Sequence, residues 1–136
     1  MRDARRRTQA QTIGDAAEAL VAARLESAGW RVLGRNVRVG RFELDVLAVD
    51  PGPPAALVIV EVRYRARRDF GLPEETVDRR KRAHLRAGAL ALVERGAIAA
   101  GADALPRLPL RLDLVVVEPP PSRTGEPRIR HHRSFG

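Results

Sequence analysis

Acidic side chains lie on two segments of this 136-residue chain that have the composition of neighbouring β-strands. Glu43 and Asp45 alternate with apolar residues in the segment 41–49, and Glu61 follows an apolar run in the segment 55–63. Side chains two positions apart in a strand point to the same face of a sheet. Pairing the two segments as a hairpin would therefore gather three carboxylates on one face.

The turn between these segments predicts how they pair. Residues 50–54 have the sequence Asp-Pro-Gly-Pro-Pro, in which proline fixes φ and withholds a backbone donor. A hairpin symmetric about the central proline places Asp45 opposite Glu61. The same register places Glu43 opposite Arg63. Two carboxylates about 4 to 5 Å apart repel by roughly 3 to 4 kcal/mol at an effective dielectric constant near 20, so we expect a compensating cation.

A divalent metal ion would provide that compensation. Mg²⁺ prefers one or two carboxylates together with water and a substrate phosphate, and Mn²⁺ accepts the same ligands. Such an ion lowers the pKa of bound water and neutralises the charge that develops on a phosphodiester. Asp45 and Glu61 are therefore candidate ligands of a hydrolytic metal site. The alternative is a solvated sheet face on which Glu43 and Arg63 form an ordinary ion pair.

The only lysine of the chain lies in a predicted helix over residues 74–95. On a helical projection Lys81 falls on the apolar side together with Leu85, and three arginines fall on the opposite side. An inward-pointing lysine is either a snorkelling side chain at the rim of the apolar stripe or a cation beside an acidic, phosphate-binding site. The outward arginines are Arg79, Arg82 and Arg86.

A further acid, Glu18, lies on a predicted first helix over residues 12–28. Thr12 and Asp15 resemble a capping box at the start of this helix, and Gly29 is typical of its end. Glu18 is at the margin of the apolar stripe, so it either faces a cleft or lies in solvent.

The elements that carry these residues are expected to form one domain. A chain of 136 residues with 44% hydrophobic composition can bury one aliphatic core. A helix, three strands, a helix and a strand predict an α/β fold with a central mixed sheet flanked by two main helices. The predicted strands are 30–38, 41–49, 55–63 and 110–117.

The two ends of the chain differ from this domain in composition. We expect a basic, flexible arm over residues 1–12, the single domain over 13–118, and a proline-rich basic tail over 119–136. The tail either adds a short edge strand or stays solvated, and we expect His131 and His132 to be solvated with it.

Charge and composition narrow the expected partners. The formal net charge of +8 attracts polyanions such as nucleic acid, but five aromatic residues are too few for rows of stacking rings. The expected phosphate contacts are Arg38, Arg65, Arg67 and Arg68. The absence of cysteine excludes thiol chemistry. No apolar run approaches the roughly 20 residues of a membrane helix, so we expect a cytoplasmic protein without a membrane partner.

The motifs together resemble a known family over residues 13 to 135. They are Gly14 with Glu18, Gly29-Trp30, Asn36-Val37-Arg38, Glu43-Leu44-Asp45, Val60-Glu61-Val62-Arg63, Lys81 and Leu112-Asp113-Leu114-Val115. In order and spacing they resemble the YraN family of small bacterial proteins of uncharacterised function. That family is similar to Holliday-junction resolvases and to the PD-(D/E)XK superfamily, so the resemblance implies a restriction-endonuclease-like fold.

The resemblance also implies a role for each candidate residue. Asp45 matches the aspartate of the superfamily motif and Glu61 its second acid. Glu18 matches a helix glutamate that often completes such sites, so these three residues are the implied ligands of Mg²⁺ or Mn²⁺. Lys81 matches a basic position on the second helix.

Two residues depart from the family pattern. Arg63 stands where the pattern has a lysine that positions or activates the attacking water. An arginine keeps the charge, but its pKa is too high for a general base. Phe42 stands where a glycine usually precedes the first acid.

These features support three interpretations of function. The first is a metal-dependent endonuclease with Asp45, Glu61, Arg63, Lys81 and Glu18 as catalytic residues. It would act on DNA rather than RNA, including branched DNA, and a resolvase-like role would require a homodimer. The second is a nuclease-like module that binds nucleic acid without turnover, which the Arg63 departure favours. The third is a small basic interaction protein whose acids balance local arginines.

Overall fold

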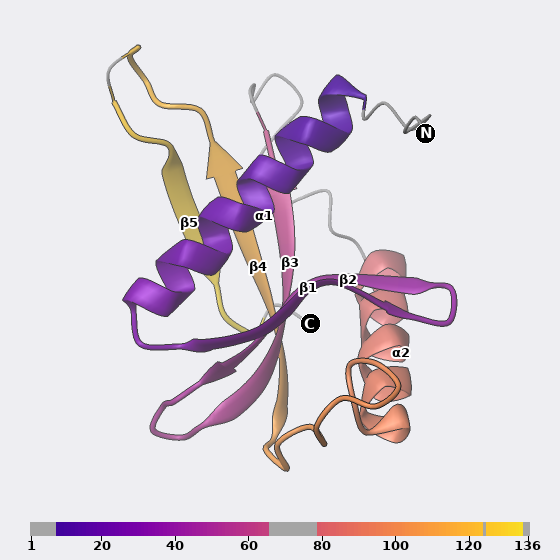
Figure 1. Cartoon of the computed structure of the whole chain (residues 1–136). Coiled ribbons are helices and arrows are strands. Elements are labelled where there is room, and N and C mark those ends of the chain that lie inside the picture. Colours follow the sequence, from indigo (N-terminus) through magenta and orange to yellow (C-terminus); the bar gives the residue numbers. More distant parts are fainter. Residues whose placement is uncertain (1–7, 66–78, 124, 135–136) are drawn as a thin grey trace.

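Five strands form one sheet between two helices (Figure 1). The computed structural model describes residues 8–65, 79–123 and 125–134. Its elements are α1 (Gln9–Ser27), β1 (Arg31–Val39), β2 (Phe42–Asp50), β3 (Ala56–Tyr64), α2 (Arg79–Arg95), β4 (Leu110–Glu118) and β5 (Arg128–His132). The predicted α/β fold with a central mixed sheet is confirmed, and it is compatible with the restriction-endonuclease-like fold that the resemblance implies.

Helix α1 begins one turn earlier than the capping pattern at Thr12 predicts. The Thr8 hydroxyl accepts a hydrogen bond from the Gln11 N–H at 3.1 Å, and the Gln11 side chain accepts one from the Thr8 N–H at 2.9 Å. This reciprocal pair is a capping box, so Thr8 is the N-cap. Thr12 lies inside the helix, where its hydroxyl donates to the Thr8 carbonyl. At the other end Gly29 adopts the left-handed backbone expected after a helix, with φ 91°.

The strands follow in sequence order across the sheet. Neighbouring strands are antiparallel except β3 and β4, which are parallel and joined through α2. The β2–β3 ladder runs from Asp50 opposite Ala56 to Val46 opposite Val60, which confirms a hairpin symmetric about Pro53. Strand β5 pairs with β4, so the end of the chain does add an edge strand.

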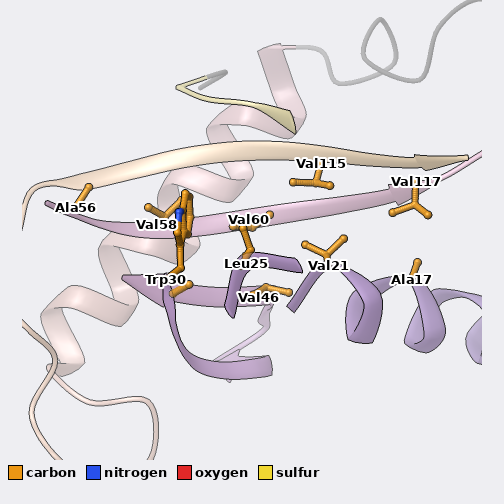
Figure 2. Close-up of a cluster of buried hydrophobic side chains, with 11 residues drawn as sticks. Ala17, Val21, Leu25, Trp30, Val46, Ala56, Val58, Val60, Val115 and Val117 are labelled. Atoms are coloured by element: carbon orange, nitrogen blue, oxygen red, sulfur yellow. The ribbon is translucent and has the colours of Figure 1, made fainter. Parts of the chain in front are cut away.

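The two helices pack on opposite faces of the sheet. Val21 and Leu25 of α1 lie with Trp30 against the valines of one face, as Figure 2 shows. Leu85 and Leu92 of α2 pack against the other face. Each fully buried aliphatic side chain contributes about 1.5 to 3 kcal/mol, so these contacts fix both helices relative to the strands. Residues 74–78 of the predicted second helix lie outside the described part of the chain.

Gly88 allows α2 to lie close to β2. A Cβ atom at Gly88 would be 3.1 Å from Phe42 Cβ and 3.2 Å from Leu44 Cδ2. Phe42, which departs from the family pattern, therefore packs where α2 has no side chain. Its ring also lies 4.9 Å from the ring of His84.

The substitution Gly88→Ala should destabilise the fold although alanine favours helices. Helix propensity alone would add about 1 kcal/mol, but forcing a methyl group into this contact costs typically 1 to 3 kcal/mol. We expect the free energy of unfolding, measured by urea denaturation, to fall by about 1 kcal/mol. The matched control is Gly14→Ala in α1, where a Cβ atom would meet nothing within 4 Å and stability should rise. A rise for both variants would contradict the close packing.

Candidate functional site

Asp45 lies where β2 and β3 separate. Backbone pairing between the two strands ends with Val46 opposite Val60. Just beyond that point, Asp45 Oδ2 accepts a hydrogen bond from the Val62 N–H at 2.9 Å. The carboxylate takes the place of a strand carbonyl, so the backbone of β3 fixes its position relative to Glu61.

The carboxyl groups of Asp45 and Glu61 contact each other. Glu61 is only 6% exposed. Burial raises the pKa of Asp45 to about 8, and the charge of Glu61 and a hydrogen bond between the two side chains act in the same direction. A hydrogen bond between two carboxyl groups requires one of them to hold a proton. The predicted encounter of these two acids is therefore confirmed, and the pair favours an added positive charge.

Glu18 approaches the same pair from α1. Burial raises the pKa of Glu18, and the charges of Glu43 and Glu61 raise it further. The charge of Arg35 and a hydrogen bond from Asn36 act in the opposite direction. The Oε1 atom of Glu18 is buried without a hydrogen-bond partner among the described residues. Glu18 therefore has an unused oxygen beside two further carboxyl groups.

Arg35 and Asn36 are neighbours of Glu18 that the sequence did not predict as site residues, although Asn36 belongs to one of the family motifs. Asn36 has a left-handed backbone, with φ 51°, inside strand β1. Asparagine tolerates this conformation better than most residues. An asparagine that interrupts an apolar strand pattern is the signal that could have identified this position.

Two cations lie against one oxygen of Glu61. Arg63 Nε is 3.3 Å and Lys81 Nζ is 3.5 Å from Glu61 Oε2. Arg63 Nε is buried and its N–H is not oriented for a hydrogen bond, so this contact is electrostatic. The helical projection correctly predicts that Lys81 points inward. Strand β3 and helix α2 thus bring both predicted cations to the acidic pair.

Glu43 does not pair with Arg63 as the hairpin register predicts. Its partner is Arg38 of β1, with Arg38 Nη2 3.2 Å from Glu43 Oε2. The prediction fails because β2 leaves β3 after Val46 and stays paired with β1. Glu43 and Arg38 also line a polar cavity of about 430 Å³ that includes Glu18.

Of the remaining predicted phosphate contacts, Arg65 directly follows β3. The Arg65 side chain donates a hydrogen bond to the Tyr64 carbonyl, and its backbone N–H donates to the Val117 carbonyl. Arg67 and Arg68 lie outside the described residues. Arg38 is 77% exposed, so it remains accessible despite its ion pair.

The oxygen donors of this site suit a hard divalent ion. Across the described ranges no three His, Asp or Glu side chains have the spacing of a preformed metal centre. Mg²⁺ does not need one, because it binds through one or two carboxylates and keeps several waters. Two facing carboxyl groups and the unpartnered Glu18 Oε1 fit such an ion better than zinc, which favours nitrogen and sulfur ligands.

A second ionic cluster, centred on Asp113, lies on the α1 face of the sheet. Asp113 is fully buried and accepts two hydrogen bonds from Arg111 at 2.9 Å. His131 Nε2 lies 2.8 Å from Asp113 Oδ2, and the Ser134 N–H donates to Oδ1 at 3.0 Å. The prediction that His131 is solvated is therefore wrong, because β5 places it against a buried carboxylate. Arg111 also binds Asp50 at 2.9 Å.

The Asp113 cluster has the character of a structural site. Burial acts to raise the pKa of Asp113, but hydrogen bonds from His131 and Arg111 outweigh it and lower the pKa to about 2. Both carboxylate oxygens of Asp113 have partners, whereas Glu18 Oε1 has none among the described residues. The cluster joins β5 to the sheet and provides no free ligand.

Comparisons with known proteins agree with these motifs. A model of the uncharacterised protein family UPF0102 matches residues 17–117. A UPF0102 protein of Symbiobacterium thermophilum is 37% identical over 110 residues, covering 80% of this chain and 84% of the relative. One from Deinococcus radiodurans is 37% identical over 116 residues, covering 85% and 87%. One from Moorella thermoacetica is 42% identical over 73 residues, covering 54% and 58%.

These matches confirm the resemblance to the YraN family, which is the family UPF0102, and the names of the relatives state no activity. Neither described helix is long and apolar enough to cross a membrane.

Proposed function

The chain belongs to the uncharacterised protein family UPF0102, and we propose that it is a metal-dependent endonuclease-like protein that acts on nucleic acid. The contact between the Asp45 and Glu61 carboxyl groups, with Lys81 and Arg63 on the same Glu61 oxygen, carries this proposal. Two ionised acids that face each other destabilise a fold unless a proton or a cation offsets their repulsion. Such an arrangement is typical of sites that bind a metal ion and a phosphate.

Asp45 and Glu61 would hold Mg²⁺ or Mn²⁺, with Glu18 as a third oxygen donor. When bound, the ion would supply charge neutralisation at the phosphodiester and a more acidic water molecule. The Val62 N–H keeps Asp45 in place through a hydrogen bond. The protein thus provides a ligand on a rigid strand rather than on a loop.

Lys81 and Arg63 would bind the non-bridging oxygens of the phosphate. Lys81 is 35% exposed at its side chain, so it can reach both Glu61 and an arriving anion. Arg63 is more buried and cannot act as a general base, because an arginine guanidinium stays protonated in proteins. Proton removal from water would therefore fall to a carboxylate or to Lys81.

DNA is the proposed partner, and branched DNA a proposed substrate. The net charge of +8 and the exposed Arg38 beside the polar cavity favour a polyphosphate over a small anion. We expect DNA affinity to fall steeply with salt concentration because arginine–phosphate contacts release counterions.

Cleavage of branched, single-stranded and duplex substrates with Mn²⁺ tests the proposal. We expect wild type to cleave at least one of them, and Glu61→Gln to lose that activity. The matched control is Glu43→Gln, since Glu43 is a neighbouring acid paired with Arg38 and lies outside the Asp45–Glu61 contact. Equal cleavage by wild type and Glu61→Gln would point to a contaminating nuclease and reject the site.

Arg63→Lys should increase cleavage. Lysine keeps the positive charge near Glu61 but can lose a proton when buried, which arginine cannot. General acid–base catalysis accelerates reactions by factors of about 10² to 10⁴. We expect the single-turnover cleavage rate of Arg63→Lys to exceed that of wild type by roughly tenfold. Unchanged or lower cleavage by Arg63→Lys would show that Arg63 is not what limits the reaction.

The alternative is a nuclease-like module that binds nucleic acid without turnover, and Arg63 favours it. Salt-sensitive DNA binding by wild type, with no cleavage by wild type or by Arg63→Lys in Mg²⁺ or Mn²⁺, would select this alternative.

A further inference from the structure

Helix α2 has an apolar strip on the side that faces away from the sheet. Within the described ranges three large apolar side chains are exposed, and two of them, Leu90 at 57% and Val93 at 48%, lie on this helix. The sheet-facing side already buries Leu85 and Leu92. A helix that packs on one side only usually has a polar outer side. The exposed residues along the outer α2 face are Arg79, Arg80, Arg82, Ala83, Arg86, Ala87, Leu90, Val93 and Glu94.

Charge is unevenly distributed along this outer α2 face. Its first half carries Arg79, Arg80, Arg82 and Arg86, whereas its last turn carries Glu94, the only acid of α2. Arg95 does not offset Glu94, because its guanidinium donates to the carbonyls of Arg38 and Ala97 and so turns back onto its own chain. The outer α2 face is therefore basic at one end and acidic at the other.

We propose that the outer α2 face is a self-association surface, on which α2 packs antiparallel against α2 of a second copy of the chain. A two-fold axis between residues 87 and 90 would place Leu90 over Ala87 of the second copy. Small residues such as Ala83 and Ala87 leave the space that a leucine side chain fills when two helices pack. Each such contact occurs twice, because a two-fold interface uses the same surface from both chains.

The same register pairs the opposite charges of the outer α2 face. Glu94 comes to lie opposite Ala83 of the second copy, one helical turn from Arg79 on one side and Arg86 on the other. A parallel arrangement would instead bring the arginines of both copies together. Charge complementarity therefore selects the antiparallel pair.

A second copy fits this surface better than nucleic acid does. Phosphates would be repelled by Glu94 and would leave Leu90 and Val93 without apolar partners. Val93 also lines an apolar cavity of about 610 Å³ together with Leu105 and Leu108. That cavity extends the apolar surface beyond the helix, toward the roughly 1,200 Å² or more that stable interfaces bury.

Sedimentation velocity over a range of protein concentrations, without metal or DNA, tests the proposal independently of the candidate site. We expect wild type to dimerise and Leu90→Glu to raise the dimer Kd by about a hundredfold or more, since each dimer loses the contact twice. Arg86→Glu and Glu94→Arg should each weaken the dimer. The double variant Arg86→Glu/Glu94→Arg should restore it, because the charges are exchanged in both copies.

The matched control is Ile13→Glu, which places the same charge at an exposed apolar position on α1 and should leave the dimer intact. Circular dichroism spectra should show that all variants are folded. A wild type that is monomeric at all concentrations overturns the proposal, and so does a dimer that persists in Leu90→Glu. Failure of the double variant to recover overturns the antiparallel register. If wild type is monomeric and Arg86→Glu lowers its DNA affinity, the outer α2 face is assigned to nucleic acid instead.

Discussion

Asp45→Asn is expected to make the metal-free protein more stable and to abolish its response to Mn²⁺. Burial and the neighbouring Glu61 charge raise the pKa of Asp45 to about 8, so an ionised Asp45 opposes folding. Asparagine has nearly the same shape, keeps an oxygen for the Val62 N–H, and carries no charge. The substitution therefore removes the repulsion and retains the hydrogen bond that fixes the residue.

The size of the gain should depend on pH. Because the folded-state pKa of Asp45 lies above its ordinary value of 3.8, wild type loses stability as pH rises from about 4 to about 8. Asp45→Asn has no such loss. In urea denaturation with EDTA, we expect the free energy of unfolding of Asp45→Asn to exceed that of wild type by at least about 2 kcal/mol at pH 8. The difference should be much smaller at pH 4.

Mn²⁺ should stabilise wild type but not Asp45→Asn. An ion that binds only the folded state stabilises it by about 2.7 kcal/mol at a hundredfold excess over Kd. We expect MnCl₂ to raise the Tm of wild type and of the control Glu43→Gln, but not that of Asp45→Asn. Cleavage by Asp45→Asn should fall by more than about a hundredfold. An Asp45→Asn variant that is less stable without metal, or that still responds to Mn²⁺, would contradict the assignment of Asp45 as a ligand.

The encounter of Asp45 and Glu61 was predictable because it depends on local chemistry. The proline-rich turn sets the hairpin register, and side chains alternate strictly near that turn. The partner of Glu43 was not predictable in this way. Beyond Val46, β2 is no longer paired with β3, and Phe42 and Leu44 lie close to Gly88 of α2. The strand pattern alone does not predict such contacts between distant segments.

The Asp113 cluster shows the same limit more strongly. Arg111 and Asp113 are two residues apart in a strand, so the sequence predicts that they share a face. The further partner of Asp113, His131, reaches it because β5 pairs with β4. Basic residues after three prolines resemble a solvated tail in composition. Pairing of β5 with β4 removes His131 from solvent, and the sequence pattern predicted this edge strand only as one of two alternatives.

Asp113→Ala should lower the free energy of unfolding by more than Gly88→Ala does. The carboxylate is fully buried and accepts four hydrogen bonds, from Arg111, His131 and the Ser134 N–H. Breaking a buried ion pair by removing one partner costs about 3 to 5 kcal/mol, and here Arg111 would keep only Asp50 as an acidic partner. We expect a loss of this size in urea denaturation at pH 7. The control Asp103→Ala removes an exposed loop carboxylate and should change stability by less than about 0.5 kcal/mol.

A milder variant keeps this prediction testable if Asp113→Ala does not fold. His131→Ala removes one of the four hydrogen bonds and should lower the free energy of unfolding by about 1 to 2 kcal/mol. If both variants retain wild-type stability, the cluster does not hold β5 on the sheet.

The acid limb of the stability curve tests the cluster in the wild-type chain. Because hydrogen bonds lower the pKa of Asp113 from 3.8 to about 2 against the effect of burial, its contribution is complete above pH 4 and is lost as pH falls toward 2. That contribution corresponds to about 2 to 3 kcal/mol. Asp113→Asn carries no titrating group, so its stability should fall less steeply than that of wild type between pH 4 and 2. Parallel acid limbs for the two proteins would show that Asp113 is not held ionised by its partners.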